Sequence, residues 1–224
     1  MPIQLVFKKG QDYTVNITHK IDDFLISYEA ILYNDVPLEK TNVKSFLKRI
    51  ERVADELAIN KATFFIDFIY DVGGAACCVD EQNIVHLTLP ITVRDNKILI
   101  DNRGIDEDYL LYHELMHAKE VLDGRFPSSG LLGPENIAEK LIFRLTDFAN
   151  EGKLESMNRP HQSRETTIDN IYNCFVEDFE FGVIPEWIMS LLTKEKVAEL
   201  CDKVWGKELT YSEAEGIINE LLSK

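Results

Sequence analysis

His113, Glu114 and His117 are the residues of this sequence whose types and spacing could do chemistry. On a helix, residues four apart lie about 40° apart around the axis, so both imidazole rings can reach one metal ion. Glu114 is turned by roughly 100° from His113, a position from which a carboxylate can reach a metal-bound water. The pattern predicts a metal site that activates water. The plainer interpretation is a buried helix whose histidines bond to neighbouring carbonyl groups.

The residues on either side of this pattern predict the helix that it needs. Asp106 is a good N-cap, and Glu107 and Asp108 suit the positive end of a helix dipole. No Pro or Gly interrupts residues 110–122, and Gly124 follows as a stop. The apolar residues of this run make a broad stripe, which predicts a mostly buried helix.

A hydrolytic zinc site needs three protein ligands and one open position for water. Glu151 is the first candidate for the third ligand, because it lies on the flank of the apolar face of a helix expected from Pro134 to about Ser156. Asp123 is the main rival, although an unbroken helix would turn it about 120° away from His117. Weaker candidates are Glu135, Glu139 and His161.

The order His113-Glu114-x-x-His117 and then Asn150-Glu151-Gly152 resembles the gluzincin metallopeptidases, whose third zinc ligand is a downstream glutamate. The resemblance covers about residues 41 to 156, where a helix, a strand, an Ala-rich strand pair and the motif helix follow in the usual zincin order. It implies a compact zincin-like fold, a Zn²⁺ cofactor held with Glu151, and Glu114 as general base. It also implies that the strand at 84–89 lies beside the cleft and pairs with an extended substrate.

The chain also departs from the known branches of that group. The segment between His117 and Glu151 holds 33 residues (118 to 150), which is longer than in the classical branches. The Gly-x-Met-x-Asn motif of the aminopeptidases is absent. Asp123 stands where metzincin-like enzymes place their last ligand, but Glu120 replaces the glycine at which their helix breaks. The resemblance therefore implies a zincin of unassigned family.

The pattern of elements predicts an α+β fold, with a small mixed or antiparallel sheet and a helical C-terminal part. Strands are expected at 4–7, 13–17, 24–32, 63–70, 75–79, 84–89 and 98–100, and a helix from the N-cap Thr41 to about Ala58. Later helices are expected at 168–181, 185–192, 194–204 and 212–222. We predict an N-terminal β segment (1–40), a catalytic core (41–156) and a helical extension (157–224), packed as one compact unit.

Composition limits the partners of the protein. A formal charge of −15 and a pI near 4.7 disfavour nucleic acid and anionic membranes as partners. No apolar stretch is long enough to span a membrane, and Lys8 and Lys9 follow the first apolar residues, the wrong order for a secretory signal. We therefore expect a soluble, cytoplasmic protein whose four cysteines are free thiols.

The function predicted from these features is zinc-dependent hydrolysis of peptide bonds in a peptide or protein substrate. The alternatives are a catalytically inactive zincin-like binding or regulatory protein and a purely structural zinc domain. The intact Glu114 disfavours the first, and the cysteine spacing disfavours the second. The oxyanion stabiliser stays open among Tyr172, His161 and Arg164, and His86 is expected to be structural. Substrate, endo- or exopeptidase action and oligomeric state are not specified.

Overall fold

The computed structural model describes residues 4–8, 13–21, 24–32, 42–59, 63–70, 75–95, 97–100, 107–128 and 137–223. The chain divides into two compact units, each described here by itself. Unit 1 comprises residues 1–123 with 128–131, and unit 2 comprises residues 124–127 with 132–224. The division predicted from the sequence, with limits after residues 40 and 156, stays a prediction.

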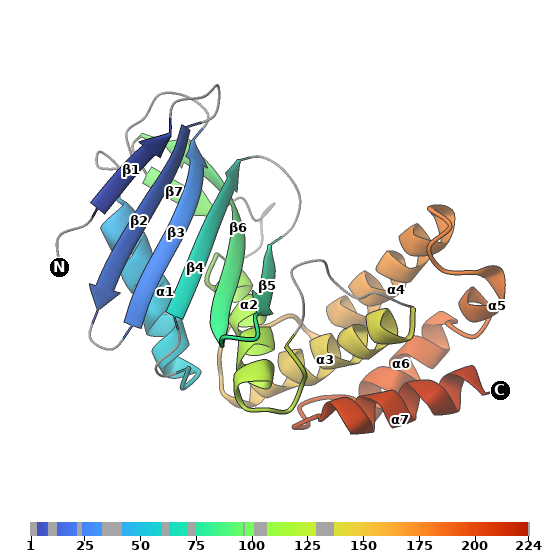
Figure 1. Ribbon diagram of the computed structural model, residues 1–224. Coiled ribbons are helices and arrows are strands. Elements are labelled where there is room, and N and C mark those ends of the chain that lie inside the picture. The colour runs from blue at the N-terminus through green and yellow to red at the C-terminus, as the bar shows by residue number, and fades with distance from the viewer. Residues whose placement is uncertain are drawn as a thin grey trace. The chain divides into compact units, whose positions relative to one another are not determined.

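Unit 1 is built on a mixed seven-stranded sheet (Figure 1). Its strands are β1 (Gln4–Lys8), β2 (Tyr13–Ile21), β3 (Phe24–Leu32), β4 (Thr63–Tyr70), β5 (Ala76–Val79), β6 (Ile84–Arg94) and β7 (Lys97–Ile100). The order is β1-β2-β3-β4-β6-β5, and β7 pairs with the second half of β6. β3, β4 and β6 run parallel, whereas the other pairs are antiparallel.

The alternation along β6 explains why this segment is a strand with one buried face. Val85, Leu87 and Leu89 are fully buried, while His86 and Thr88 between them are half-buried. Successive side chains of a strand point to opposite faces, so this period of two places the three apolar residues in the core. Phe64 and Ile66 of β4 have the same spacing and are also buried.

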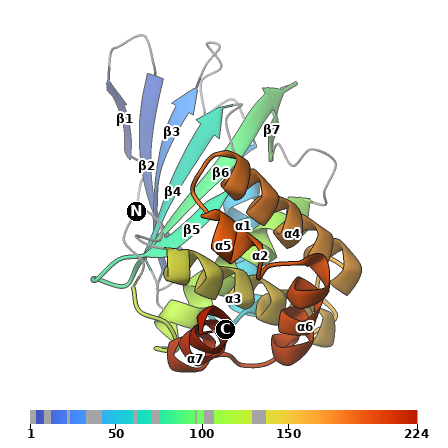
Figure 2. The ribbon, with the colours of Figure 1, turned by 90° about the vertical axis from the view of Figure 1, so that its right-hand side faces the viewer.

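Two helices, α1 (Val43–Glu56) and α2 (Glu107–Leu122), lie on the same face of the sheet (Figures 1 and 2). The helix predicted from Thr41 to about Ala58 is confirmed, and apolar residues at helical spacing, among them Phe46, Ile50 and Val53, are buried. Its predicted N-cap, Thr41, lies outside the described residues, and Asn42 holds the N-cap position. The Asn42 side chain makes no capping bond, because its Oδ1 accepts a hydrogen bond from the Ile98 amide at 2.7 Å.

Side chains of α1 fix α2, the helix that carries the histidines. Asp108 in the first turn of α2 accepts hydrogen bonds from Arg49 Nε at 2.5 Å and from Arg52 Nη2 at 2.9 Å. One turn further along α2, the Tyr112 hydroxyl donates to Glu56. Helix α2 ends before Gly124, whose φ of +71° suits the predicted stop.

Unit 2 is helical. Its helices are α3 (Ile137–Ser156), α4 (Arg164–Glu180), α5 (Glu186–Met189), α6 (Lys194–Val204) and α7 (Tyr211–Leu222) (Figure 2). The start predicted for α3 at Pro134 lies outside the described residues. Helix α4 begins at Arg164, four residues before the start predicted from the sequence, because the Ser163 side chain caps it by accepting from the Thr166 amide.

The α+β class is thus confirmed. Among the described helices, none is long and apolar enough to cross a membrane. All four cysteines are free thiols, as expected.

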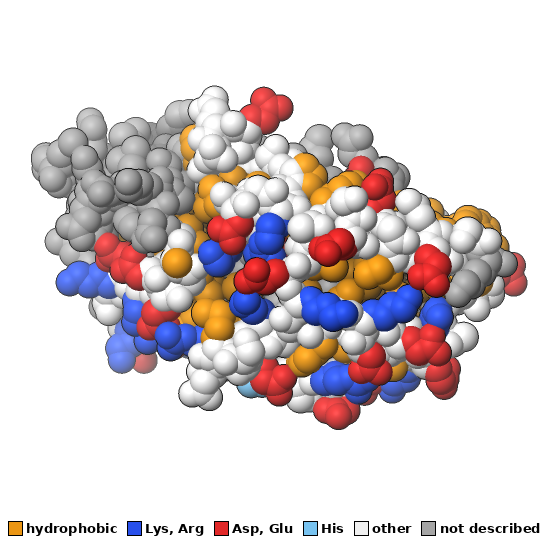
Figure 3. Space-filling view, turned by 90° about the horizontal axis from the view of Figure 1, so that it is seen from below, with side chains coloured by type: hydrophobic (Ala, Val, Ile, Leu, Met, Phe, Trp, Pro, Cys, Tyr) orange, Lys and Arg blue, Asp and Glu red, His pale blue; other side chains and the backbone are white. Residues whose placement is uncertain are grey.

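Acidic and basic side chains are interspersed over the face shown in Figure 3.

Candidate metal centre

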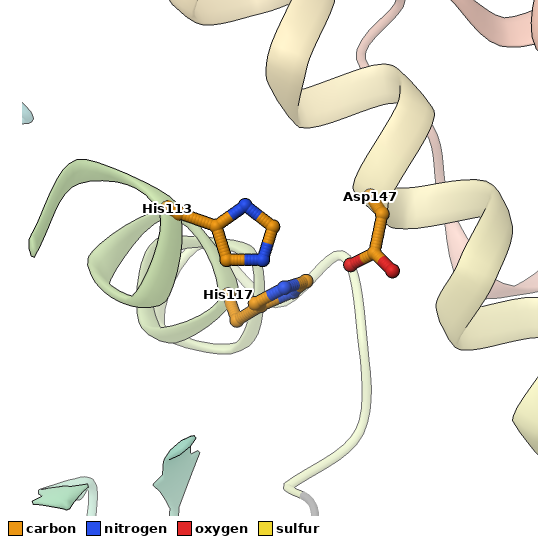
Figure 4. A group of neighbouring side chains, drawn as sticks. All are labelled: His113, His117 and Asp147. Atoms are coloured by element: carbon orange, nitrogen blue, oxygen red, sulfur yellow. The ribbon is translucent and has the colours of Figure 1, made fainter. Parts of the chain in front are cut away.

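Helix α2 presents His113 and His117 on one side, as their spacing predicts (Figure 4). The ring centroids lie 5.2 Å apart, with the rings nearly perpendicular at 83°. Both histidines are half-buried, so the rings are partly shielded from water yet still reachable. One helix could therefore offer two imidazole ligands to the same ion.

Glu114 points into the protein, toward the edge strand β5. Glu114 is 7% exposed, and its negative charge interacts electrostatically with the Cys77 thiol of β5. Burial, and then the negative charge of Glu114, raise the pKa of the Cys77 thiol well above its usual range. Cys77 is thus a neutral, structural neighbour of Glu114.

Asp147, in the middle of α3, is a buried carboxylate of unit 2. It is 8% exposed, and its Oδ2 lies 3.1 Å from Nη1 of Arg144, one turn earlier on the same helix. Burial alone would lower the pKa of Arg144, but the charge of Asp147 and the hydrogen bond to it outweigh burial, and the net shift is upward. Arg144 therefore stays charged and holds one carboxylate oxygen of Asp147.

His113, His117 and Asp147 form a group that could hold a metal ion (Figure 4). One ligand atom from each residue lies within 4.8 Å of the others. Two imidazoles and one carboxylate are a donor set that suits zinc and other transition metals, so the group alone does not identify the ion. Sequence reasoning missed Asp147, although its position four residues before Glu151 places both acids on the same side of α3.

Glu151, the third ligand predicted from the sequence, is not in this group. It is fully buried, and its Oε2 accepts a hydrogen bond from the Gln162 amide at 2.6 Å, in the loop between α3 and α4. Its role as a metal ligand stays a prediction. Its neighbour Gly152 has a clear packing role, because a Cβ there would lie 2.3 Å from the backbone nitrogen of Gly206.

The other candidate ligands are engaged elsewhere or lie outside the described residues. Asp123 Oδ2 pairs with Lys119 Nζ at 3.1 Å, one turn away on the surface of α2. His161 Nδ1 lies 2.8 Å from the Arg159 carbonyl oxygen. Glu139 is half-buried in the first turn of α3, and Glu135 lies outside the described residues.

The structure does not select an oxyanion stabiliser. Arg164 Nε donates to Asp202 at 2.8 Å on the surface of unit 2, and Tyr172 is half-buried on α4. His86, expected to be structural, has its Nε2 3.0 Å from Asp80 Oδ2. That hydrogen bond is the main reason that the pKa of Asp80 is lowered.

The expectation that the strand at 84–89 pairs with a substrate is wrong for this sheet. Residues 85–88 of β6 pair with β4 on one side and with β5 on the other. Both backbone edges of that segment are therefore occupied. Within the described residues, β6 is the only partner of β5, so β5 has an outer edge to which a peptide could add.

Comparison with known proteins was made for the whole sequence. No model of a protein family matches the sequence, and no curated protein matches it. The residues of the candidate metal centre are thus the basis on which a function is inferred.

Proposed function

We propose that this protein is a zinc-dependent peptidase with a zincin-like core. The observation that carries the proposal is the group His113, His117 and Asp147, with Glu114 beside His113 on the same helix. A structural zinc site needs four protein ligands, whereas three ligands leave a position for water. Glu114, which follows His113 on the same helix, would supply the carboxylate that hydrolysis requires beyond metal binding.

The donor set is consistent with this ion. Zinc in hydrolytic sites is commonly held by two histidines and one carboxylate. The same set with open positions also suits iron(II), so the zinc assignment depends on Glu114, which oxygen chemistry would not need. Arg144 would hold the second carboxylate oxygen of Asp147 and so orient its first oxygen as a ligand.

In this mechanism the metal and Glu114 have different roles. When bound, zinc supplies a Lewis acid that polarises the scissile carbonyl and acidifies a water. Glu114 accepts the proton of the attacking water and donates it to the amine that leaves. Its position at 7% exposure, beside the apolar strand β5, limits competing solvent around that proton.

An extended peptide would bind along the outer edge of β5, which pairs with no other strand in the part of the chain that the structure describes. This strand is antiparallel to β6 and lies against α2, close to Glu114. Backbone hydrogen bonds to residues 76–79 would hold a substrate independently of its sequence, and side-chain pockets would give specificity. We therefore assign the role first expected for β6 to β5.

A peptide-library cleavage assay tests this function. The wild type should release new amino termini in the presence of zinc and lose that activity with a chelator. Glu114→Gln should keep the metal and lose about 10²- to 10⁴-fold in rate, because the side chain can no longer accept the proton. Glu81→Gln, an exposed change of the same kind in the β5–β6 turn, is the matched control and should retain full rate.

The outcome also separates peptidase from binding protein. A Glu114→Gln variant that cleaves as fast as the wild type would refute the proposed mechanism. Bound zinc without cleavage of any library peptide would favour an inactive zincin-like binding protein.

A further inference from the structure

Each metal-site histidine has its Nδ1 atom next to another side chain of the same helix. Nδ1 of His113 lies 3.3 Å from the hydroxyl of Tyr109, four residues earlier. Nδ1 of His117 lies 3.4 Å from Oε2 of Glu120, three residues later. In both cases the contact is made at Nδ1, so a metal ion would be bound through Nε2. The two contacts come from opposite directions along α2, so the sequence of one helix sets both rings.

Glu120 is an unusual residue for its position. It is 2% exposed, and among the described residues no hydrogen-bond partner reaches its buried Oε1 or the Nδ1 atom of His117. Burying a carboxylate in this way is unfavourable unless another group uses its charge. His117 is the ionisable side chain beside it: its Nδ1 lies 3.4 Å from Oε2 without a hydrogen bond in this orientation, and a small rotation of the ring would form one.

We propose that Glu120 and Tyr109 are positioning residues that fix the ring tautomer and orientation of His117 and His113, so that both present Nε2 to the metal. This inference rests on the proposed function. A carboxylate only accepts hydrogen bonds, so Glu120 requires the Nδ1–H form of His117 and leaves the Nε2 lone pair for the ion. Such an outer partner also makes the imidazole a better ligand.

The two positioning residues differ in strength. A tyrosine hydroxyl can either accept from Nδ1–H or donate to a bare Nδ1, so Tyr109 orients the ring of His113 without fixing its tautomer. Glu120 does both for His117. The effect of Glu120 on metal binding should therefore exceed that of Tyr109.

The first readout uses the metal-free protein. Ring ¹⁵N chemical shifts, recorded at a pH where the histidines are neutral, report which nitrogen carries the proton. We expect His117 in the Nδ1–H form in the wild type and in the Nε2–H form in Glu120→Met. An Nε2–H form in the wild type would overturn the inference whatever the metal affinity.

The second readout is zinc affinity, measured by competition with a chromophoric chelator. Glu120→Met should weaken binding by about 10- to 100-fold, Glu120→Gln by less, and Tyr109→Phe by at most about tenfold. Glu81→Met, the same replacement at an exposed position of unit 1, should stay within about twofold. Affinity in Glu120→Met that matches the control would overturn the inference.

Thermal unfolding of the metal-free variants separates positioning from a structural role. Because Met removes a buried carboxylate with an unsatisfied oxygen, Glu120→Met should unfold at the same or a higher temperature while binding zinc more weakly. If Glu120 served only packing, Glu120→Met would lower both the unfolding temperature and the zinc affinity. A wild type that binds no metal would refute the proposed function and this role with it, whereas unchanged zinc binding in Glu120→Met would refute this inference alone.

Discussion

Asp108 is the residue that fixes the start of the histidine helix to α1, and its protonation should control part of the stability of unit 1. Burial raises the pKa of Asp108, but the hydrogen bonds and charges of Arg49 and Arg52 outweigh burial, and the net shift is downward. A lowered folded-state pKa contributes stability above the unfolded value near 3.9, and this stability is lost as pH falls through the folded value.

Asp108→Asn should therefore lower the free energy of unfolding by about 1 to 2 kcal/mol at neutral pH, the usual value of a charge-assisted hydrogen bond. The difference from wild type should shrink at acid pH, as the pH falls through the lowered folded-state pKa of Asp108. Urea unfolding at both pH values measures it. Asp55→Asn, at an exposed position of α1, is the control. An equal loss at both pH values would contradict the assigned cause.

At the same scale, residue types predicted part of the metal centre. The spacing of His113 and His117 is a local property, and α2 forms as expected. The third ligand, a carboxylate, is different, because Asp147 and Glu151 are one turn apart on α3 and periodicity does not separate them. The amide that donates to Glu151 belongs to Gln162 in the loop that follows α3, so a contact outside the helix makes the distinction.

Three helices end in the same kind of turn, in which one residue has a positive φ, but that residue is of a different type in each turn. The residues are Ala58 (φ 57°) after α1, Asn158 (φ 53°) after α3 and Gly182 (φ 72°) after α4. In each, the next amide bonds back to a carbonyl five residues earlier. Ala58 is the strained member, since a Cβ disfavours this conformation by about 1 kcal/mol or more.

Ala58→Gly should raise the free energy of unfolding by about 0.5 to 1 kcal/mol, because glycine adopts positive φ without strain. Gly182→Ala is the matched reverse change. Open space surrounds its Cβ position, so it should lower stability by about 1 kcal/mol through backbone strain alone. Chemical denaturation of both variants checks the pair, and a stabilising Gly182→Ala would contradict this explanation.

Gly152 marks the close approach of α3 to the connection between α6 and α7. A Cβ at this position would also lie 2.8 Å from Cδ1 of Trp205, in addition to the clash with the Gly206 backbone. Gly152→Ala should destabilise by about 1 to 3 kcal/mol, the usual cost of overpacking.

The control for this prediction is Gly216→Ala in the exposed part of α7. Its Cβ would meet nothing within 4 Å, so the better helix propensity of alanine should stabilise by up to about 1 kcal/mol. Thermal or urea unfolding shows whether each substitution lowers or raises the free energy of unfolding. Equal effects at both positions would show that helix propensity, and not packing, decides at Gly152.

Periodicity predicted most of the helices and strands, but it did not predict which strands pair with one another. The stripe of α1 and the short apolar run of β4 lie where expected. Helix α4 begins before residue 168, the start that periodicity predicts, because the cap at Ser163 lies within the polar segment that contains Pro160. The pairing of β5 outside β6 depends on strand order, which local sequence does not encode.

For the whole molecule, the metal should contribute to stability as well as chemistry. An ion that binds only the folded chain stabilises it by about 4 kcal/mol when its free concentration is 1,000 times the dissociation constant. Zinc should therefore raise the unfolding temperature of the wild type and leave His117→Ala unchanged. A chelator should reverse the rise. A rise of equal size in His117→Ala would place the metal elsewhere.

The central measurement is the metal content of untagged protein, purified without chelator and compared across four chains. These are the wild type, His117→Ala, Asp147→Asn and Glu151→Gln, the last chosen because glutamine can still accept from the Gln162 amide. We predict about one zinc per chain in the wild type and in Glu151→Gln, and none in the other two. Loss in Glu151→Gln with retention in Asp147→Asn would return the third ligand to Glu151. A wild type without metal, even after zinc reconstitution, would contradict the metal centre.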